Sequence, residues 1–274
     1  MVARLSVSVV TYRPDLTLLQ RTLATLARSA LQAREAGELS EATLFLIDNG
    51  PAESSSAVRE MLAHWPAELG PAEVLSGHGN VGYGRGNNLA LPRLSSDVHL
   101  ILNPDVEVDA QALGAALRTL RENPDVGMVA PDAHAPSGAR EYLCRRHPSV
   151  WVLFLRGFAP AFLKRRFTAA LAHYEMRDTI GDRFVKGVPI ASGCFQLVRT
   201  PLFARLGGFD PRYFMYFEDY DLSLRVGRES SIAYEPAARI VHHGGGAARK
   251  GLRHLGWFVA SGFKFFSRHG WRWR

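Results

Sequence analysis

The chain of 274 residues is 47% hydrophobic and carries a formal net charge of +7, so it can bury a large core and favours a polyanionic partner such as a nucleic acid, an anionic lipid or a phosphate-rich ligand. Its two cysteines, Cys144 and Cys194, are too few for a disulfide framework, and their spacing matches no zinc motif. No run of about 18 apolar residues exists, so we expect no membrane-spanning helix, and the N-terminal apolar segment is too short for a secretory signal.

Strands and helices alternate through the first half of the chain. Apolar runs predict strands, and leucines at helical spacing predict helices. The strands are expected at residues 5–12, 42–50, 72–76, 97–108 and 126–131, and the helices at residues 15–34, 54–65, 88–94 and 109–123. Asp15 is the expected N-cap of the first helix. This alternation is typical of a parallel, doubly wound α/β sheet, in which ligands bind at the carboxyl ends of the strands.

The second half of the chain is less regular, and residues 133–188 are basic and aromatic without clear periodicity. The remaining elements are expected as a strand at residues 189–200, helices at 201–209, 218–230 and 253–270, and strands at 231–236 and 238–246. No repeat or linker separates the two halves, which favours one continuous domain over two.

A glycine-rich stretch at residues 77–88 follows the third expected strand. Its glycines match the G-x-G-x-x-G spacing of dinucleotide-binding proteins, but that fingerprint belongs after the first strand, so a dehydrogenase is disfavoured. Two interpretations remain open. The stretch is either a plain loop or a place where the backbone approaches a ligand closely while Asn80, Asn87 and Asn88 offer hydrogen bonds.

The segment Asn103-Pro104-Asp105 is a candidate cation site. Side chains two residues apart on an extended chain face the same way, and Pro104 keeps Asn103 extended. An amide oxygen beside a carboxylate suits Mg²⁺ or Mn²⁺, although Asn-Pro-Asp is also a common turn. His242 follows a later strand and becomes a candidate ligand if it converges on Asp105, since a lone histidine is more often structural.

Three carboxylates, Glu218, Asp219 and Asp221, follow directly on the aromatic run at residues 213–217. Acidic residues at the start of a helix can simply complement its dipole, but an aromatic wall beside a carboxylate is also typical of a ligand pocket. Asp219 can then take a proton from a hydroxyl group. Burial and Glu218 would raise its pKa while the helix terminus would lower it. Asp221 is expected to hold backbone or Arg225, four residues later.

These motifs in this order resemble family 2 glycosyltransferases, and most closely the bacterial rhamnosyltransferase-like branch. The resemblance is carried by "SVVTY", "IDN", "GNVGYGRGNN", "LNPD", "YFEDYDLSLR" and "IVHHGGG" and covers about residues 6–247. It implies the GT-A fold, an α/β architecture with a Rossmann-like, mostly parallel sheet flanked by helices and here a C-terminal amphipathic helix. Residues 1–274 would form one domain: a nucleotide-sugar-binding half (1–131), an acceptor and catalytic half (132–248) and a basic, aromatic C-terminal helix (249–274).

The resemblance also implies site residues. Asp219, with Glu218 beside it, would supply the catalytic base, and Asp105 with His242 would hold the metal, His243 being the alternative. The donor would contact Thr11, Tyr12, Asp48, Asn80, Gly82, Asn88 and Asn103. The acceptor would contact Ser192, Gly193 and Tyr216.

The chain departs from the family pattern at three places: Asn103 replaces the first carboxylate of the DxD element, "IDNGPAESS" is looser than the usual acidic-and-serine turn, and Ala247 stands where a serine is common. Fewer charged ligands would therefore hold the metal. Direct displacement with inversion needs only one base, whereas a double displacement would need a second carboxylate such as Glu218. A hydrolase would use two carboxylates but would not need the nucleotide-binding half.

The implied partners are a nucleotide-sugar donor, with dTDP-rhamnose favoured over a UDP- or GDP-sugar, and a saccharide or lipid-linked saccharide acceptor. The C-terminal segment interleaves aromatic and basic residues, which is typical of a helix that binds an anionic membrane surface and also of one packed on the domain through Trp257, Phe258 and Phe265. We expect a cytoplasmic protein that can bind the inner face of the membrane peripherally. A nucleic acid partner is not expected, because no binding motif is present and the basic residues flank the expected cleft.

Overall fold

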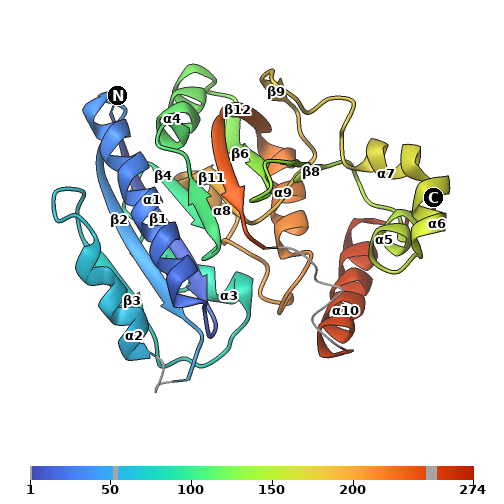
Figure 1. Cartoon of the computed structure of the whole chain (residues 1–274), viewed down its shortest axis with the longest axis horizontal. Coiled ribbons are helices and arrows are strands. Elements are labelled where there is room, and N and C mark those ends of the chain that lie inside the picture. Colours follow the sequence, from blue (N-terminus) through green and yellow to red (C-terminus); the bar gives the residue numbers. More distant parts are fainter. Residues whose placement is uncertain (1, 52–54, 245–251) are drawn as a thin grey trace.

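The protein was analysed as a computed structural model that describes residues 2–51, 55–244 and 252–274. Within these ranges ten strands form one mixed sheet, in the order β3-β2-β1-β4-β11-β6-β12-β5, with β7 paired to β6 and β9 paired to β12 (Figure 1). The strands of this sheet are β1 (Ala3–Thr11), β2 (Leu39–Asp48), β3 (Ala72–Leu75), β4 (Val98–Leu102), β5 (Val106–Val108), β6 (Val126–His134), β7 (Arg140–Glu141), β9 (Val185–Lys186), β11 (Phe195–Arg199) and β12 (Ser231–His242). A separate pair is formed by β8 (Cys144–Arg145) and β10 (Ile190–Ala191).

Helices cover the sheet and build the end of the molecule that lies beyond β8. Their bounds are α1 (Leu16–Glu35), α2 (Ser55–Glu60), α3 (Tyr83–Asn88), α4 (Ala112–Glu122), α5 (Val150–Gly157), α6 (Ala161–Arg166), α7 (Thr168–Tyr174), α8 (Thr200–Arg205), α9 (Glu218–Glu229) and α10 (Leu252–His269), with short 3-10 turns η2 (Met61–His64) and η3 (Leu91–Arg93). None of the helices in the described ranges combines the length and the apolar character needed to cross a membrane.

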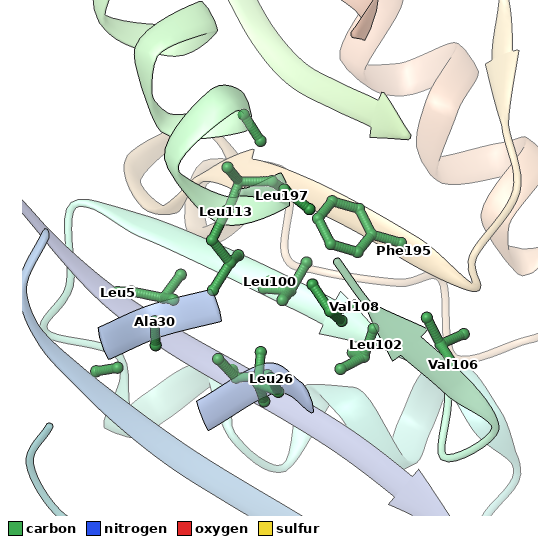
Figure 2. Packing of buried hydrophobic residues seen from close by; sticks show 14 of the residues in the cluster. Leu5, Leu26, Ala30, Leu100, Leu102, Val106, Val108, Leu113, Phe195 and Leu197 are labelled. Atoms are coloured by element: carbon green, nitrogen blue, oxygen red, sulfur yellow. The ribbon is translucent and has the colours of Figure 1, made fainter. Parts of the chain in front are cut away.

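The core forms between the sheet and the helices α1 and α4. Leucines at helical spacing bury one face of α1, and Asp15 caps this helix as expected, since its carboxylate accepts a hydrogen bond from the Leu18 N–H at 3.1 Å. Figure 2 shows Leu26 of α1 and Leu113 of α4 pointing into the same apolar layer as Leu100 of β4. Burial of these side chains holds the strands in register and thereby positions the polar residues that follow each strand.

The sheet confirms the expected alternation but is mixed rather than wholly parallel. Strands β1, β2, β3 and β4 run parallel, whereas β11 is antiparallel to both β4 and β6. The expectation of one strand over residues 97–108 is wrong, because the chain leaves β4, in the middle of the sheet, after Leu102 and forms β5 at the end of the sheet order beyond β12. Two strands were expected over residues 231–246, and a single strand, β12, runs through to His242 with a register shift between Glu235 and Arg239.

Helical structure also differs in two places from the sequence expectation. The helix expected at residues 88–94 begins earlier, within the glycine-rich stretch, as α3 (Tyr83–Asn88). Residues 133–188, expected to be irregular, contain the short helices α5, α6 and α7. Figure 1 shows these three helices beside α10 at the end of the molecule that also holds the C-terminus.

Candidate active site

Polar side chains meet where β1 and β2 end. Thr11 and Asp48 are the last residues of these strands and lie opposite each other in the parallel register. The Thr11 hydroxyl donates to the Asp48 carboxylate at 3.3 Å, and the Gly50 N–H donates to the same oxygen at 2.9 Å. Tyr12, one residue further on, is 51% exposed, and the Arg13 guanidinium lies 5.7 Å from its ring centroid. Two buried polar groups and an open aromatic face therefore occupy the edge where a nucleotide was expected.

The glycine-rich stretch joins this edge to the second half of the chain. Gly82 has a φ of +89° and begins α3, and a Cβ at this position would lie 2.2 Å from the Phe214 carbonyl oxygen. The Tyr83 N–H donates to that same oxygen at 3.0 Å. Only glycine therefore fits at position 82, because the loop packs directly against the backbone before α9.

The asparagines of the stretch make hydrogen bonds within the protein. Asn80 accepts from the Gly82 N–H at 3.1 Å. Asn88 donates to the Phe209 carbonyl at 2.7 Å and accepts from the Phe209 N–H at 2.8 Å, while buried Asn87 accepts from the Ser8 hydroxyl at 2.6 Å. Both ends of the Asn88 amide are thus engaged, so its role in this geometry is to join α3 to residue 209 rather than to present an amide to solvent.

Asp105 and His242 lie beside each other. The sequence analysis required this proximity for His242 to be a candidate cation ligand. Because β5 pairs with β12 in the register His242 to Val106, Asp105 lies beside the end of β12. The His242 Nε2 atom is 3.7 Å from the Asp105 Oδ1 atom, which is too long for a hydrogen bond. Among the described residues this Oδ1 atom is buried without a hydrogen-bond partner. A Cβ at Gly244 would lie 2.5 Å from His242 Nε2 and 2.6 Å from Asp105 Oδ2, so glycine keeps the space beside both groups.

Glu141 orients His242. Its carboxylate lies 3.0 Å from the His242 Nδ1 atom, which leaves Nε2 as the ring nitrogen that faces Asp105. A carboxylate on the far nitrogen of a histidine is the usual second-sphere partner of a metal ligand. Sequence analysis missed Glu141, because it lies 101 residues before His242 in a stretch without a motif.

His243, the alternative ligand, faces elsewhere. Its Nε2 atom lies 2.7 Å from the Glu107 carboxylate, and its N–H donates to the Asp105 carbonyl at 2.9 Å. Successive side chains on a strand point to opposite faces, so only His242 can lie beside the Asp105 carboxylate.

The Asp105–His242 pair fits a divalent cation in an open site. An ion bonded to both groups at about 2.1 Å can span the gap between them, and an uncompensated buried carboxylate oxygen is the kind of atom that such an ion satisfies. No third histidine, cysteine or acidic side chain completes a closed cluster within the described ranges. Such a site suits Mg²⁺ or Mn²⁺, which commonly share their coordination between one or two carboxylates, phosphate oxygens and water.

Asp219 is held at the first turn of α9. Its two carboxylate oxygens accept hydrogen bonds from the Gly193 N–H and from the Tyr220 N–H, each at 2.9 Å. The Tyr83 hydroxyl donates to the Gly193 carbonyl at 2.7 Å, so Gly193 is fixed between α3 and α9. Burial raises the pKa of Asp219, and the two N–H donors oppose that shift. The sequence left open whether the pKa of Asp219 is raised or lowered, and in the structure it is raised.

A sharp backbone turn delivers Glu218 into the interior. Tyr216 and Phe217 both have left-handed φ values, +70° and +66°, which cost of order 1–3 kcal/mol each for residues of this type and are typical of functional sites. Glu218 is buried, and its Oε2 atom has no hydrogen-bond partner among the described residues. Burial and the adjacent Asp219 raise the pKa of Glu218 to about 8. At neutral pH the buried pair thus favours a proton on Glu218.

The aromatic run before α9 packs under α10. Phe214 contacts Trp257 with ring centroids 4.8 Å apart, and Phe217 contacts Phe258 at 5.1 Å and Phe265 at 5.3 Å. The C-terminal helix is therefore packed on the domain through the three residues expected for that arrangement. Phe265 is buried, and Trp257 and Phe258 are half-buried.

Two further contacts join α10 to the aromatic run and to α9. The Tyr216 hydroxyl lies 2.8 Å from His254 Nδ1. Asp221 accepts from Arg225 Nε at 2.7 Å, as expected, and lies 2.8 Å from His269 Nε2 of α10. The C-terminal helix thus supports the turn that presents Asp219.

The segment Ser192–Cys194 makes hydrogen bonds both to Asp219 and to the chain that leads into Asp105. The Gly193 N–H binds Asp219, and the next residue accepts a hydrogen bond at its carbonyl from the Asn103 N–H at 2.9 Å. Burial raises the pKa of the Cys194 thiol, and the charges of Asp105, Glu141 and Asp219 raise it further. Gly193 and Cys194 thus connect the candidate base Asp219 to the backbone at Asn103, two residues before Asp105.

Comparison with known proteins identifies the class of protein that this fold and site define. The family model described as Glycosyl transferase family 2 matches residues 6–207, and the chain belongs to that family. It is a glycosyltransferase.

Two curated relatives are rhamnosyltransferases. The chain is 27% identical over 289 residues to the N-acetylglucosaminyl-diphospho-decaprenol L-rhamnosyltransferase of Mycobacterium tuberculosis, with 98% of this chain and 86% of that protein covered. It is 26% identical over 206 residues to the rhamnosyltransferase WbbL of Escherichia coli, with 72% and 74% covered. These relatives support the expected rhamnosyltransferase-like branch of the family.

Solved structures show the same fold at low sequence identity. GalNAc-T7 with UDP, GalNAc and Mn²⁺ superposes with a TM-score of 0.64 at 14% identity, over 92% of this chain and 45% of that one. The mannosyltransferase PcManGT from Pyrobaculum calidifontis, in complex with GDP-Man and Mn²⁺, gives a TM-score of 0.62 at 17% identity, over 98% and 66%. The chain thus spans less than half of the first protein and about two thirds of the second. The fold is GT-A, as the sequence predicted.

Proposed function

We propose that the protein transfers rhamnose from dTDP-rhamnose, with inversion, to a hydroxyl group of a lipid-linked saccharide during synthesis of a bacterial surface polysaccharide. The observation that carries this proposal is the linkage through Gly193 and Cys194, whose backbone groups bind the candidate base Asp219 and the chain at Asn103, two residues before Asp105 of the candidate cation pair. The sugar and the lipid-linked acceptor are proposed because the relative from Mycobacterium tuberculosis is named for both.

The donor would bind along the carboxyl ends of β1, β2 and β4. Tyr12 offers an exposed ring for a base, Thr11 and Asp48 offer polar groups beside it, and Asn103 leads toward Asp105. A divalent cation bound by Asp105 and His242 would neutralise charge on the diphosphate leaving group. Glu141 keeps the His242 ring oriented for that role.

Asp219 would act as the general base. As the acceptor oxygen bonds to the anomeric carbon and the bond from that carbon to the diphosphate oxygen breaks, the hydroxyl proton passes to the Asp219 carboxylate. The hydrogen bonds from Gly193 and Tyr220 hold this carboxylate in place and favour its ionised form. Glu218 stays protonated, so it is a poor nucleophile, and a single displacement that inverts the anomeric configuration follows.

The acceptor would approach from the side of α9 and α10. Ser192 and Gly193 lie next to the base, and Tyr216 faces α10 through its hydroxyl group. Since a lipid-linked acceptor is anchored in a membrane, we propose that the enzyme acts at the cytoplasmic face of that membrane.

The experiment that tests this function is a panel of nucleotide sugars measured with and without Mn²⁺. A ligand that binds only the native state raises its melting temperature, so dTDP-rhamnose with Mn²⁺ should give the largest shift in a panel that includes UDP- and GDP-sugars. Transfer to a lipid-linked acceptor followed by NMR of the product should show the inverted anomer. A larger shift with a UDP- or GDP-sugar would overturn the donor, and retention of configuration would overturn the single displacement.

A further inference from the structure

Exposed apolar side chains are concentrated on one end of the molecule. Eight of the twelve large hydrophobic side chains that are exposed in the described part of the chain belong to α5, α6 and the turn between them, to α10, or to the residues after α10. Six of them form two ladders: one follows a single stripe of α10 with a step of four residues, and the other runs over α5, the turn after it and α6. The ladders are Phe154, Phe158 and Phe162, and Leu255, Val259 and Phe263.

The two ladders belong to one continuous surface. The ring of Phe158 lies 6.0 Å from that of Phe258 on α10. The chain after α10 then pairs with the start of α5, because the Val150 N–H donates to the Arg272 carbonyl at 2.8 Å. Figure 1 shows α5, α6 and α10 beside one another at the end of the molecule that holds the C-terminus. We call this surface, made of α5, α6, α10 and residues 270–274, the C-terminal face.

The C-terminal face is positively charged. Neither residues 142–174 nor residues 236–274 contain an aspartate or a glutamate, although the whole chain has 26 acidic residues. Lys164, Arg165 and Arg166 form the last turn of α6. Arg272 and Arg274 follow α10 and are both exposed. Basic residues therefore border the exposed aromatic side chains, the combination typical of helices that lie in the interface of a bilayer.

The opposite side of α10 supports the candidate site. Trp257 and Phe258 pack against the aromatic run before Asp219, and His254 lies 2.8 Å from the Tyr216 hydroxyl. One helix, about 10 Å thick with its side chains, thus separates the outer surface from the wall expected to meet the acceptor. A flat partner bound to the outer surface would lie next to the acceptor side of the site.

We propose that the C-terminal face docks on an anionic lipid bilayer, with the two aromatic and aliphatic ladders entering the interface and the basic residues contacting lipid headgroups. A second copy of the chain is a poorer partner, because self-association through this face would bring positive charges together. The proposal deepens the proposed function, since docking would hold a lipid-linked acceptor beside α10. Its test nevertheless uses neither donor nor acceptor, so the two can fail separately.

The test is flotation of the full chain with lipid vesicles. Wild-type protein should float with vesicles of phosphatidylcholine mixed equally with phosphatidylglycerol, should bind vesicles of phosphatidylcholine alone at least about tenfold less, and should be released by high salt. The variant Val259→Glu/Phe263→Glu should lose binding by at least about tenfold, because it places charge on a stripe of α10 that contacts no core. Phe184→Glu is the matched control, since Phe184 is also exposed but lies before β9, outside the C-terminal face, and this variant should bind like wild type.

Two further measurements keep the outcome unambiguous. The melting temperature and circular dichroism of each variant should match those of wild type, which shows that lost flotation is not lost folding. Equal flotation of Val259→Glu/Phe263→Glu and wild type would overturn the proposal, as would equal binding to both vesicle compositions. A dimer in light scattering that this double variant dissociates, together with no flotation of wild type, would identify a second copy as the partner and would also overturn it.

Discussion

The parallel strands β1, β2 and β4 and the α9–α10 region contribute to the same site by different means. On the strand side, backbone register alone brings Thr11 opposite Asp48 and takes the chain to Asp105. On the helical side, Asp219 depends on two left-handed residues, on the Gly193 N–H and on the packing of α10. The strand side, meaning the carboxyl ends of β1, β2 and β4, is thus positioned by the sheet itself. On the helical side, meaning α9, α10 and the aromatic run before α9, the geometry of Asp219 is maintained by tertiary contacts between segments far apart in the sequence.

The difference matters for how each side responds to change. A substitution on the strand side should affect the ligand that it touches and little else, because the core below β1 and β4 is continuous. A substitution in α10 should change both stability and the position of Asp219. The following predictions test this contrast, from the largest expected effect to the smallest.

Asp219→Asn should separate chemistry from binding. Removing a general base lowers the rate by about 10²–10⁴-fold, so kcat should fall about 10³-fold while the Kd for the donor stays within about twofold, because the donor is held on the strand side. Steady-state kinetics and calorimetry measure the two quantities. Asp182→Asn, the same change at a carboxylate whose side chain is 84% exposed, is the control. Turnover above about a tenth of wild type in Asp219→Asn would show that another group takes the proton.

Phe265→Ala should test the dependence of the helical side on packing. Phe265 is 2% exposed and contacts Phe217 and Tyr220, and truncation of such a ring costs about 3–5 kcal/mol in the free energy of unfolding. Phe263→Ala, two residues away on the exposed side of the same helix, should cost less than about 0.5 kcal/mol. Urea unfolding of the two variants gives the comparison directly. A similar cost for both would mean that α10 does not pack on the aromatic run.

Glu141→Gln should weaken the cation site without removing a ligand. Loss of a second-sphere carboxylate lowers metal affinity by about 10–100-fold, so the Mn²⁺ concentration that half-saturates donor binding should rise by about tenfold or more. Glu107→Gln makes the same change beside His243 and should leave that concentration unchanged. If the two variants behave alike, His242 has no special relation to the metal.

Glu218→Gln should flatten the pH dependence of stability. The pKa of Glu218 in the folded protein, about 8, exceeds its ordinary value, so the folded state keeps a proton that the unfolded state releases above about pH 4.5. The stability of wild type should therefore fall as pH rises from about 5 to 8, and Glu218→Gln should remove at least about 1 kcal/mol of that fall. The stability of Glu218→Gln should still depend on pH to some extent, since the pKa of Asp219 is raised as well. Chemical unfolding across this range measures it, and parallel wild-type and variant curves would contradict the buried, protonated Glu218.

Much of the strand side could be predicted from the sequence because strand alternation and apolar runs are local signals. They placed Thr11, Asp48 and Asp105 within expected strands toward the carboxyl ends, and His242 was a candidate ligand only if it met Asp105. The break between β4 and β5 was missed, because the apolar pattern continues through Asn103-Pro104-Asp105. Glu141 was missed because its contact with His242 needs β6 to pair with both β7 and β12, and the pairing of β6 with β12 joins distant parts of the chain without a motif.

The helical side was less predictable for a related reason. The carboxylates Glu218 and Asp219 were identified beside an aromatic run, but sequence alone could not decide what covered that run. The answer depends on α10, which packs there through Phe258 and Phe265 while keeping a second apolar stripe exposed. Likewise the fixed role of Asn88 depends on a partner, Phe209, 121 residues away.

The account depends most on the Asp105–His242 pair and the Asp219 carboxylate both facing one bound donor diphosphate. A crystal grown with dTDP and Mn²⁺, measured at the manganese absorption edge, tests this directly. We predict an anomalous peak within coordination distance of an Asp105 carboxylate oxygen and His242 Nε2, with the diphosphate on the side of the ion that faces Asp219. A peak at any other residues, or a diphosphate turned away from Asp219, would contradict the account.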